Sequence, residues 1–281
     1  MARVQTLVVD QFGAFVGKHS GRLRVTVKDE KVTEAPILHL EQVLITGNGV
    51  SLSADAVRAC CEKGIPIYFL SSIGRPYAAL YSSGLTGTVQ TRRSQMMAYH
   101  DRRGLALAQA FARGKLENQA AFLRYVAKYR KETDPTLHRE LCWTAGEIRD
   151  HLQELDSLEG TTVDAVRAQM LGVEGRAAQA YWTALQRLVP GEYGWPGRVG
   201  RGAKDAVNSA LNYGYGILYG QVERAVVLAG LDPYAGFIHV DRPGKPSLVL
   251  DLIEEFRVAA VDRVVFGLVG KGVRFEQDEG G

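Results

Sequence analysis

The run of residues 230–261 constrains the fold most, because it sets charged side chains in an almost wholly apolar sequence. From Leu248 onward the apolar residues leave almost no solvent-facing side on a helix. A helix of this kind is buried, so the chain must supply other helices to surround it. Three carboxylates nevertheless lie in this run, at Asp251, Glu254 and Glu255.

These carboxylates follow one another at spacings of three and four residues, so a helix places them on one face. Like charges placed in this way repel, and burying them costs on the order of several kcal/mol unless cations or donors compensate. The nearest upstream candidate for a shared ligand set is His239, fifteen residues before Glu254. An imidazole with carboxylates is a ligand set that suits a hard divalent metal ion.

A metal site is not the only interpretation of this pattern. A single His after a short apolar run is more often a core or surface residue than a ligand. Glutamates at helical spacing usually form a solvated face that pairs with Lys or Arg. The apolar context favours the metal site, because a solvated face would alternate with polar residues, and Arg257 is the one other charge before Asp262.

The first 82 residues predict a small β-sheet domain that is similar to a β-sandwich. Short apolar runs, one with period-two alternation, lie between Gly and Asp turn residues and predict strands at 6–9, 14–16, 23–28, around Val32, at 43–45 and at 65–70. Ser53 is expected to cap a helix that runs through Lys63 and stops at Gly64. His19 and His39 have no acidic partner at ligand spacing, so we interpret both as structural.

Residues 83–90 are predicted to be a linker, because small and polar residues replace the strand pattern there. Beyond it, apolar residues recur at spacings of three and four, which predicts helices at 94–113, 116–131, 136–158, 163–188 and 205–229. No closing helix is evident before the terminal Gly-Gly. The chain is therefore predicted to be an α+β protein, in which residues 91–281 form a larger all-α catalytic domain.

Composition limits the classes of function. The chain has 281 residues, with 46% hydrophobic and 23% charged, which is ordinary for a globular protein. Its three cysteines, Cys60, Cys61 and Cys142, lack metal-ligand spacing and favour a reduced protein without disulfides. The N-terminus lacks the apolar run of a signal peptide, and no run of about 18 apolar residues is present. We therefore expect a cytoplasmic protein with no membrane partner.

Basic residues are concentrated in the helical half. The net charge of +3 and pI near 8.7 permit nucleic-acid binding without arguing for it, so contacts must come from local patches. The glycine-rich segment from residue 193 to Lys204 is one such patch, since Gly lets the backbone approach a phosphate and Arg is a bidentate donor. We expect four residues to contact DNA, namely Arg198, Arg201, Lys204 and the nearby Asn208; the alternative is a solvated face.

Several motifs occur in a characteristic order: KLENQ at 115–119, DAVNSALNYGYGIL at 205–218, GLDP at 230–233, GFIH at 236–239 and SLVLDLIEEFR at 247–257. Together with the N-terminal strand region, they resemble the first-numbered Cas protein family, the CRISPR-associated endonucleases and integrases of spacer acquisition. The resemblance covers nearly the whole chain.

The resemblance implies a third metal ligand, Glu174, in the motif QMLGVEGRAA at 169–178. The small residues around Glu174 would allow another helix or a ligand to come close. The alternative is a glutamate paired locally with Arg176 or Arg167.

With this ligand, the resemblance implies that Glu174, His239 and Glu254 hold one Mg²⁺ or Mn²⁺ ion. Asp251 is assigned an auxiliary role in catalysis. Whether Asp251 or Glu255 assists the metal stays open.

The resemblance further implies that the 3′-hydroxyl of a foreign DNA fragment, the prespacer, attacks a phosphodiester at the edge of a CRISPR repeat and so inserts a new spacer. One metal site cannot serve both strand transfers of an insertion, so we expect a homodimer formed through the β-domain. A small dimer of the second-numbered Cas protein is expected to bridge two such dimers. Two alternatives remain open: a non-catalytic, structural DNA-binding subunit, and a general metal-dependent DNA or RNA nuclease.

Overall fold

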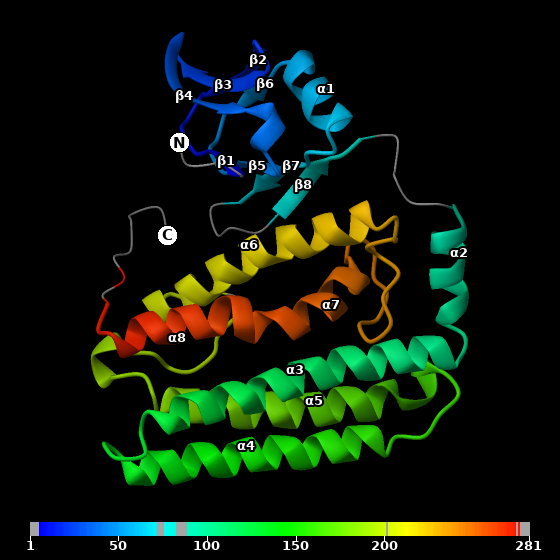
Figure 1. The fold of residues 1–281 in the computed structure, drawn as a ribbon, viewed down its shortest axis with the longest axis vertical. Coiled ribbons are helices and arrows are strands. Elements are labelled where there is room, and N and C mark those ends of the chain that lie inside the picture. The colour runs from blue at the N-terminus through cyan, green and yellow to red at the C-terminus, as the bar shows by residue number, and fades with distance from the viewer. Residues whose placement is uncertain (1–5, 72–75, 83–88, 201, 274, 276–281) are drawn as a thin grey trace. The chain divides into compact units, whose positions relative to one another are not determined.

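The structure is a computed structural model that describes residues 6–71, 76–82, 89–200, 202–273 and 275. It forms two compact units, an N-terminal unit up to residue 85 and a helical unit from residue 86 to residue 277 (Figure 1). Most of the predicted linker, residues 83–88, lies outside the described residues. Its last two residues were predicted wrongly, because Val89 and Gln90 already belong to a helix.

In the part of the N-terminal unit that the structure describes, the chain forms two four-stranded sheets and helix α1 (Ala54–Glu62) (Figure 1). In the first sheet the strand order is β1 (Thr6–Val9), β5 (Gln42–Ile45), β7 (Ile67–Leu70) and β8 (Pro76–Leu80), with only the β7–β8 pair antiparallel. In the second the order is β4 (Glu30–Pro36), β3 (Arg22–Val27), β2 (Phe15–His19) and β6 (Ser51–Leu52), with β2 and β6 parallel. A 3₁₀ turn (Ile37–His39) follows β4.

One hydrophobic core joins both sheets to helix α1. Alternate residues of β3 point into it, Leu23 and Val25 among them, as the period-two pattern predicts. The Ser53 hydroxyl accepts a hydrogen bond from the Ala56 N–H at 3.1 Å and so caps α1 as expected. The sequence did not reveal β8, a sheet-edge strand whose two alanines have little strand preference.

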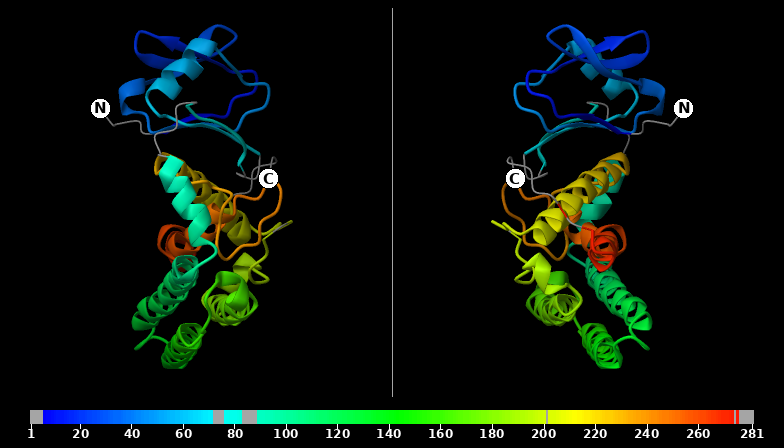
Figure 2. Two further views of the ribbon diagram at one scale, coloured as in Figure 1. Left: turned by 90° about the vertical axis from the view of Figure 1, so that its right-hand side faces the viewer. Right: turned by 90° about the vertical axis from the view of Figure 1, so that its left-hand side faces the viewer.

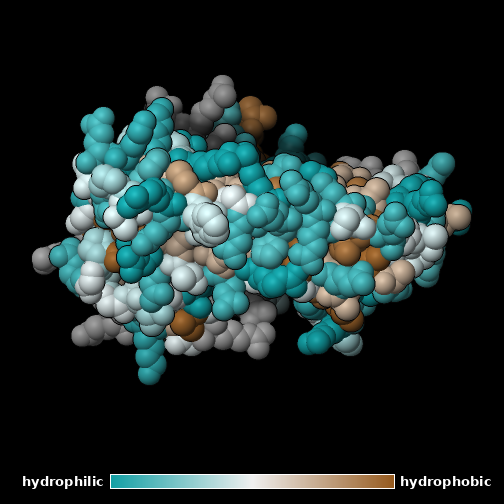
Figure 3. Space-filling view, turned by 90° about the horizontal axis from the view of Figure 1, so that it is seen from below, coloured by the Kyte–Doolittle hydropathy of each residue, from teal (hydrophilic) through white to brown (hydrophobic). Residues whose placement is uncertain are grey.

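The helical unit contains α2 (Val89–Ala98), α3 (Arg102–Lys128), α4 (Pro135–Asp156), α5 (Val163–Gln186), a 3₁₀ turn (Gly191–Tyr193), α6 (Ala206–Leu228), α7 (Ser247–Arg257) and α8 (Arg263–Gly270). Helices α3, α4 and α5 pack side by side, and α7 lies between α3 and α6 (Figures 1 and 2). Helix α4 is the outermost, and the face over which it runs is mostly hydrophilic (Figure 3). No helix in the described ranges is both long and apolar enough to cross a membrane.

The predicted break between residues 113 and 116 is wrong, because α3 continues through it. At Gly114 an added Cβ would lie 2.9 Å from Cγ of Glu255, so the glycine allows α3 and α7 to pack closely rather than ending a helix. The helix is interrupted earlier, between Ala98 and Arg102. There the Asp101 carboxylate caps α3 by accepting a hydrogen bond from the Arg103 N–H at 2.8 Å.

Helix α7 continues into α8 through a π-helical segment, Val258–Asp262. The sequence showed no closing helix because α8 is glycine-containing and rich in β-branched valines, which are weak helix formers. Burial of Val265, Phe266 and Val269 supplies the missing stabilisation. Helix α7 also has a solvent-facing edge that we did not expect, since the Phe256 side chain is exposed.

Candidate metal centre

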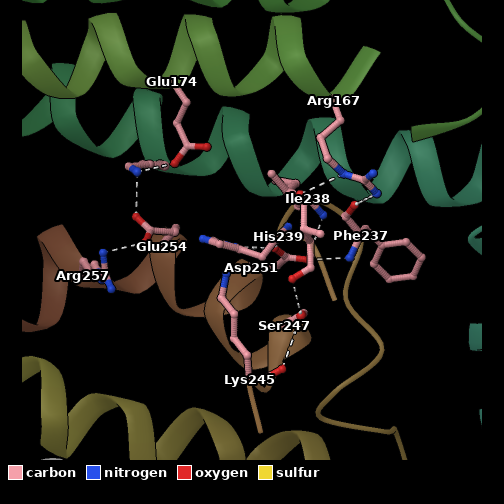
Figure 4. A network of polar contacts seen from close by, with 12 residues as sticks. Arg167, Glu174, Phe237, Ile238, His239, Lys245, Ser247, Asp251, Glu254 and Arg257 are labelled. Atoms are coloured by element: carbon pink, nitrogen blue, oxygen red, sulfur yellow. Dashed lines mark hydrogen bonds and ion pairs between the residues drawn. The ribbon is translucent and has the colours of Figure 1, made fainter. Parts of the chain in front are cut away.

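Three helices bring two glutamates together around a lysine. Glu174 of α5 and Glu254 of α7 point toward one another (Figure 4), and Lys115 of α3 lies between them. The Lys115 ammonium donates a hydrogen bond to Oε1 of Glu174, and its Nζ is 2.8 Å from Oε2 of Glu254. The three side chains are 15%, 12% and 11% exposed for Lys115, Glu174 and Glu254, so this cluster of charges is largely out of water.

Both partners of the Lys115–Glu254 pair are charged. Burial raises the pKa of the Glu254 carboxyl, but the charges of Lys115, Arg257 and, more weakly, His239 lower it by more, so the pKa lies below its ordinary value. Burial lowers the pKa of Lys115, yet Glu254 and Glu174 raise it above the usual range. The partner of Oε2 of Glu254 is the Lys115 ammonium, 2.8 Å away, so this buried oxygen already lies against a cation.

His239 lies on the loop between α6 and α7, and Asp251 of α7 fixes its position (Figure 4). The His239 Nδ1–H donates to Oδ1 of Asp251 at 2.7 Å, because a carboxylate can only accept. Asp251 also accepts from three backbone N–H groups, those of Phe237 (2.6 Å), Ile238 (3.0 Å) and His239 (2.9 Å). This arrangement sets the ring tautomer and leaves Nε2 as the nitrogen that can bind a metal.

The loop that carries His239 is held from two further helices. Gln95 of α2 donates to the carbonyls of Asp232 (2.9 Å) and Ala235 (2.8 Å). Arg167 of α5 donates to the carbonyls of Ile238 and Phe237, each at 3.0 Å. Only a glycine fits between these contacts at residue 236, since an added Cβ would lie 2.6 Å from the Ser247 backbone.

Neither of these two positioning side chains was predicted from the sequence. The burial of Gln95 is visible only in the structure, and Arg167 was considered only as a local partner for Glu174. That alternative is wrong for Arg167, which binds the loop, and for Arg176, which binds Glu154 at 2.5 Å.

The predicted ligands therefore lie in two adjacent clusters: Glu174 with Glu254, and His239 with Asp251. Among the described residues no three His, Cys, Asp or Glu side chains are close enough to hold a metal, and Lys115 stands between the two glutamates. Two converging carboxylates and an available imidazole nitrogen still fit a hard divalent ion chemically, provided that Lys115 moves.

The three acidic residues of α7 lie on one side of the helix, as their spacing predicts, but in different surroundings. Asp251 and Glu254 are buried, whereas Glu255 is half-buried and packs against Gly114. Both oxygens of Asp251 accept hydrogen bonds from the His239 loop, so in this structure Asp251 positions His239.

Two of the four predicted DNA contacts point into the protein. Asn208 is fully buried, donates to the Gly197 carbonyl at 2.8 Å and accepts from the Val199 N–H at 3.0 Å, so the prediction that it binds DNA is wrong. Arg198 is also directed inward, with its guanidinium 5.3 Å from the Tyr215 ring centre and bonded to Asn212 at 2.8 Å.

DNA contact by the other two residues, Arg201 and Lys204, stays a prediction. Arg201 lies outside the described residues. Lys204 has an exposed side chain.

A further buried acid, Asp262, lies in the π-helical segment that follows α7. Asp262 accepts hydrogen bonds from the hydroxyls of Tyr215 and Tyr181, the latter at 2.8 Å. Arg257 stacks on Tyr215, 4.9 Å from the ring centre, and its Nη1 lies 2.5 Å from Oε1 of Glu254. The π-helical segment is thus joined to Glu254 through Tyr215 and Arg257.

The chain matches the family model described as "CRISPR associated protein Cas1" over residues 7–280. It is 43% identical to the CRISPR-associated endonuclease Cas1 1 of Archaeoglobus fulgidus, over 94% of this chain and 77% of that protein.

Two solved structures are similar in fold. A casposase bound to its integration product has a TM-score of 0.78 at 24% identity, over 98% of this chain and 77% of that one. A chain of a Cas6-RT-Cas1–Cas2 complex has a TM-score of 0.73 at 20% identity, over 97% of this chain and 28% of that one.

Proposed function

Because this chain belongs to the CRISPR-associated protein Cas1 family, an endonuclease and integrase family of spacer acquisition, we propose that its strand-transfer site consists of Glu174, His239 and Glu254. The convergence of two largely buried carboxylates from α5 and α7 on one cation position is the observation that carries this assignment. A Mg²⁺ or Mn²⁺ ion bound there would polarise the scissile phosphate and stabilise the oxygens that attack and leave.

The protein's own groups prepare this site for DNA. Asp251 orients the His239 ring and favours the tautomer with its hydrogen on Nδ1, so that Nε2 is the nitrogen left to bind a metal. Gln95 and Arg167 hold the backbone on either side of Gly236, which limits the movement of His239. A site that is already ordered loses little entropy when it binds its substrate.

The proposed substrate is a prespacer whose 3′-hydroxyl attacks a phosphodiester at the edge of a CRISPR repeat. A new ester bond forms to the prespacer oxygen, and the bond to the leaving 3′-oxygen of the repeat strand breaks, so the number of phosphodiesters is unchanged. With water as the nucleophile, the same site would cut DNA. This activity places the protein in the cytoplasm, with the DNA.

Strand transfer with matched DNA ends tests the proposal. We expect metal-dependent joining of a 3′-hydroxyl fragment to a repeat duplex, none with a 3′-blocked fragment, and loss of joining by at least about 100-fold in His239→Ala. His19→Ala, in the N-terminal unit, is the control and should transfer normally.

Each alternative predicts a different result. DNA binding without any metal-dependent joining or cutting would favour a structural subunit. Turnover that is indifferent to the 3′-hydroxyl would favour a general nuclease. Normal joining by His239→Ala would rule out the assigned site.

We further propose that the active form is an assembly. An insertion needs two strand transfers, and each chain offers one such site. Exposed apolar side chains on the N-terminal unit, Phe12 at 79% and Leu38 at 81%, support a homodimer formed through this unit. The Cas1–Cas2 complex named above supports bridging of two such dimers by a second-numbered Cas dimer. Light scattering should give a dimer of the 30.8 kDa chain that gains mass with that partner and DNA.

DNA contact by Arg201 and Lys204 remains part of the proposal. Phosphate contacts release counterions, so each one contributes about −0.9 to the log–log dependence of affinity on salt. Lys204→Ala should make this slope shallower by about one contact. An unchanged slope would remove Lys204 from the DNA surface.

A further inference from the structure

A cation already stands at the candidate metal centre. The Lys115 ammonium contacts one oxygen of Glu174 and one of Glu254, and about 15% of its side chain is exposed. Arg257, the other cation beside Glu254, has a separate place, since it stacks on Tyr215 and binds the opposite oxygen, Oε1. Lys115 alone therefore stands between the two proposed ligands among the described contacts.

We propose that Lys115 is an exchangeable counter-cation: its ammonium holds Glu174 and Glu254 together in the metal-free protein and leaves them when a divalent ion enters. This inference rests on the proposed function, because it takes the two glutamates to be metal ligands. It assigns to Lys115 a role that the sequence motif alone did not define.

The metal-free state needs such a cation. Two carboxylates that converge in a largely buried site repel each other and lose hydration, and an ammonium between them offsets both costs. Lys115 therefore neutralises part of the ligands' charge before a metal binds, and a metal ion must compete with it.

The ammonium and a divalent ion cannot share these oxygens. Metal–oxygen bonds are about 2.0–2.6 Å long, so an ion bound to both glutamates would take the position of Nζ. Two cations this close would also repel strongly in a partly dehydrated site. Lysine can give way without movement of α3, because its ammonium sits on a flexible four-carbon stem.

The displaced ammonium needs another anion. In the proposed reaction that anion is an oxygen of the DNA phosphodiester, which must approach the same ion. Lys115 would then pair with carboxylates in the metal-free protein and with the phosphate when metal and DNA are bound, so its charge has an anionic partner in both states.

Metal binding without DNA tests the exchange. Lys115→Met keeps the length of the side chain and removes its charge. Because no ammonium has to be displaced, we expect Mn²⁺ titration calorimetry to show at least about tenfold tighter binding than in the parent chain. Lys128→Met is the matched control, since Lys128 is exposed on the same helix, and its affinity should equal that of the parent.

The outcomes separate this inference from the function on which it rests. Equal or weaker Mn²⁺ binding by Lys115→Met would overturn the exchange and make Lys115 a fixed structural link. Mn²⁺ binding that is insensitive to Glu254→Gln would instead overturn the metal site itself.

Chemical labelling gives a second readout that does not depend on affinity. Acylation of Lys115 by an amine-reactive ester, followed by mass spectrometry, should be slow in the metal-free chain and increase several-fold with Mn²⁺. Lys128 provides the internal standard. Labelling of Lys115 that does not rise at saturating Mn²⁺ would show that the ammonium stays in place and would refute the exchange.

Discussion

At the residue scale, Asp251 sets the position of His239 and of the loop before it. Its buried carboxylate accepts four hydrogen bonds, three from backbone N–H groups and one from the imidazole. In Asp251→Asn, the new side-chain NH₂ group would face N–H groups that now donate to Asp251, and two donors cannot form a hydrogen bond with each other. We expect urea unfolding to show a loss of roughly 2–4 kcal/mol, and strand transfer to fall about 10- to 100-fold.

Asp150→Asn is the control for this change, because Asp150 lies on an exposed face of α4. It should leave both the unfolding free energy and strand transfer unchanged. A stability of Asp251→Asn equal to that of this control would mean that the loop is held mainly by Gln95 and Arg167.

The pKa of Asp262 leads to a prediction about how the stability of the protein depends on pH. Burial raises its pKa to about 6, although hydrogen bonds from Tyr215 and Tyr181 and the charges of Arg257 and Arg198 lower it in part. An aspartate in the unfolded chain titrates near pH 4, so folding favours the protonated form. The contribution of Asp262 to stability is therefore greatest below about pH 4 and is lost as the pH rises to about 6.

Asp262→Asn removes this titration. Between pH 7 and pH 4 the parent chain should gain on the order of 2–3 kcal/mol of unfolding free energy that Asp262→Asn does not gain. Chemical unfolding of both proteins across this range measures the difference. Parallel pH profiles would contradict a raised pKa at Asp262.

Glu174, His239 and Glu254 were predicted from the sequence as site residues, but the contacts that neighbouring side chains make were not. Asn208 follows Asp205 by three residues, a spacing that permits a local bond at a helix start, yet we assigned it to DNA. Lys115 lay within a quoted motif, but its role depends on α5 and α7, which are distant in the sequence. Periodicity identifies a buried face of a helix and not the partner that it meets.

At the scale of elements, α6 crosses the π-helical segment so closely that one added methyl group tests the packing. An added Cβ at Gly214 of α6 would lie 2.6 Å from Cγ1 of Val261. Gly214→Ala should therefore cost about 1–3 kcal/mol of unfolding free energy despite the better helix propensity of alanine. Thermal and urea unfolding measure this cost.

The same helix offers a matched control. At Gly220 an added Cβ would have no heavy atom within 4 Å, so Gly220→Ala should gain roughly 0.5–1 kcal/mol. Val261→Ala should restore part of the stability of Gly214→Ala. If both glycine variants are equally stable, α6 can move away from the segment at little cost.

Local patterns predicted most elements where propensity and packing agree. Strand β1 and the start of α5 lie where the sequence predicts them, because their apolar periodicity matches their burial. The predicted break near Gly114 was wrong because the glycine serves helix packing, and α8 was missed because packing overrides its weak propensity. Both exceptions lie where α7 and its continuation meet other helices.

At the scale of the whole molecule, each unit has a hydrophobic core of its own. A fragment of residues 86–277 should therefore fold without the N-terminal unit and retain its helical circular dichroism and Mn²⁺ binding. It should be monomeric by light scattering, whereas residues 1–85 should form the dimer. A dimeric helical fragment would place the proposed interface elsewhere, and an unfolded one would show that its core is insufficient.

The π-helical segment has a consequence for how this protein can change in evolution. Such a segment is an α-helix that takes up one extra residue through hydrogen bonds spanning five residues in place of four, so the helices on either side of it keep their register. Removal of one residue would restore α-helical hydrogen bonds and leave Val265, Phe266 and Val269 directed into the core. Ala259 and Ala260 are exposed, so we expect this part of the gene to tolerate a change in length of one residue as well as substitution.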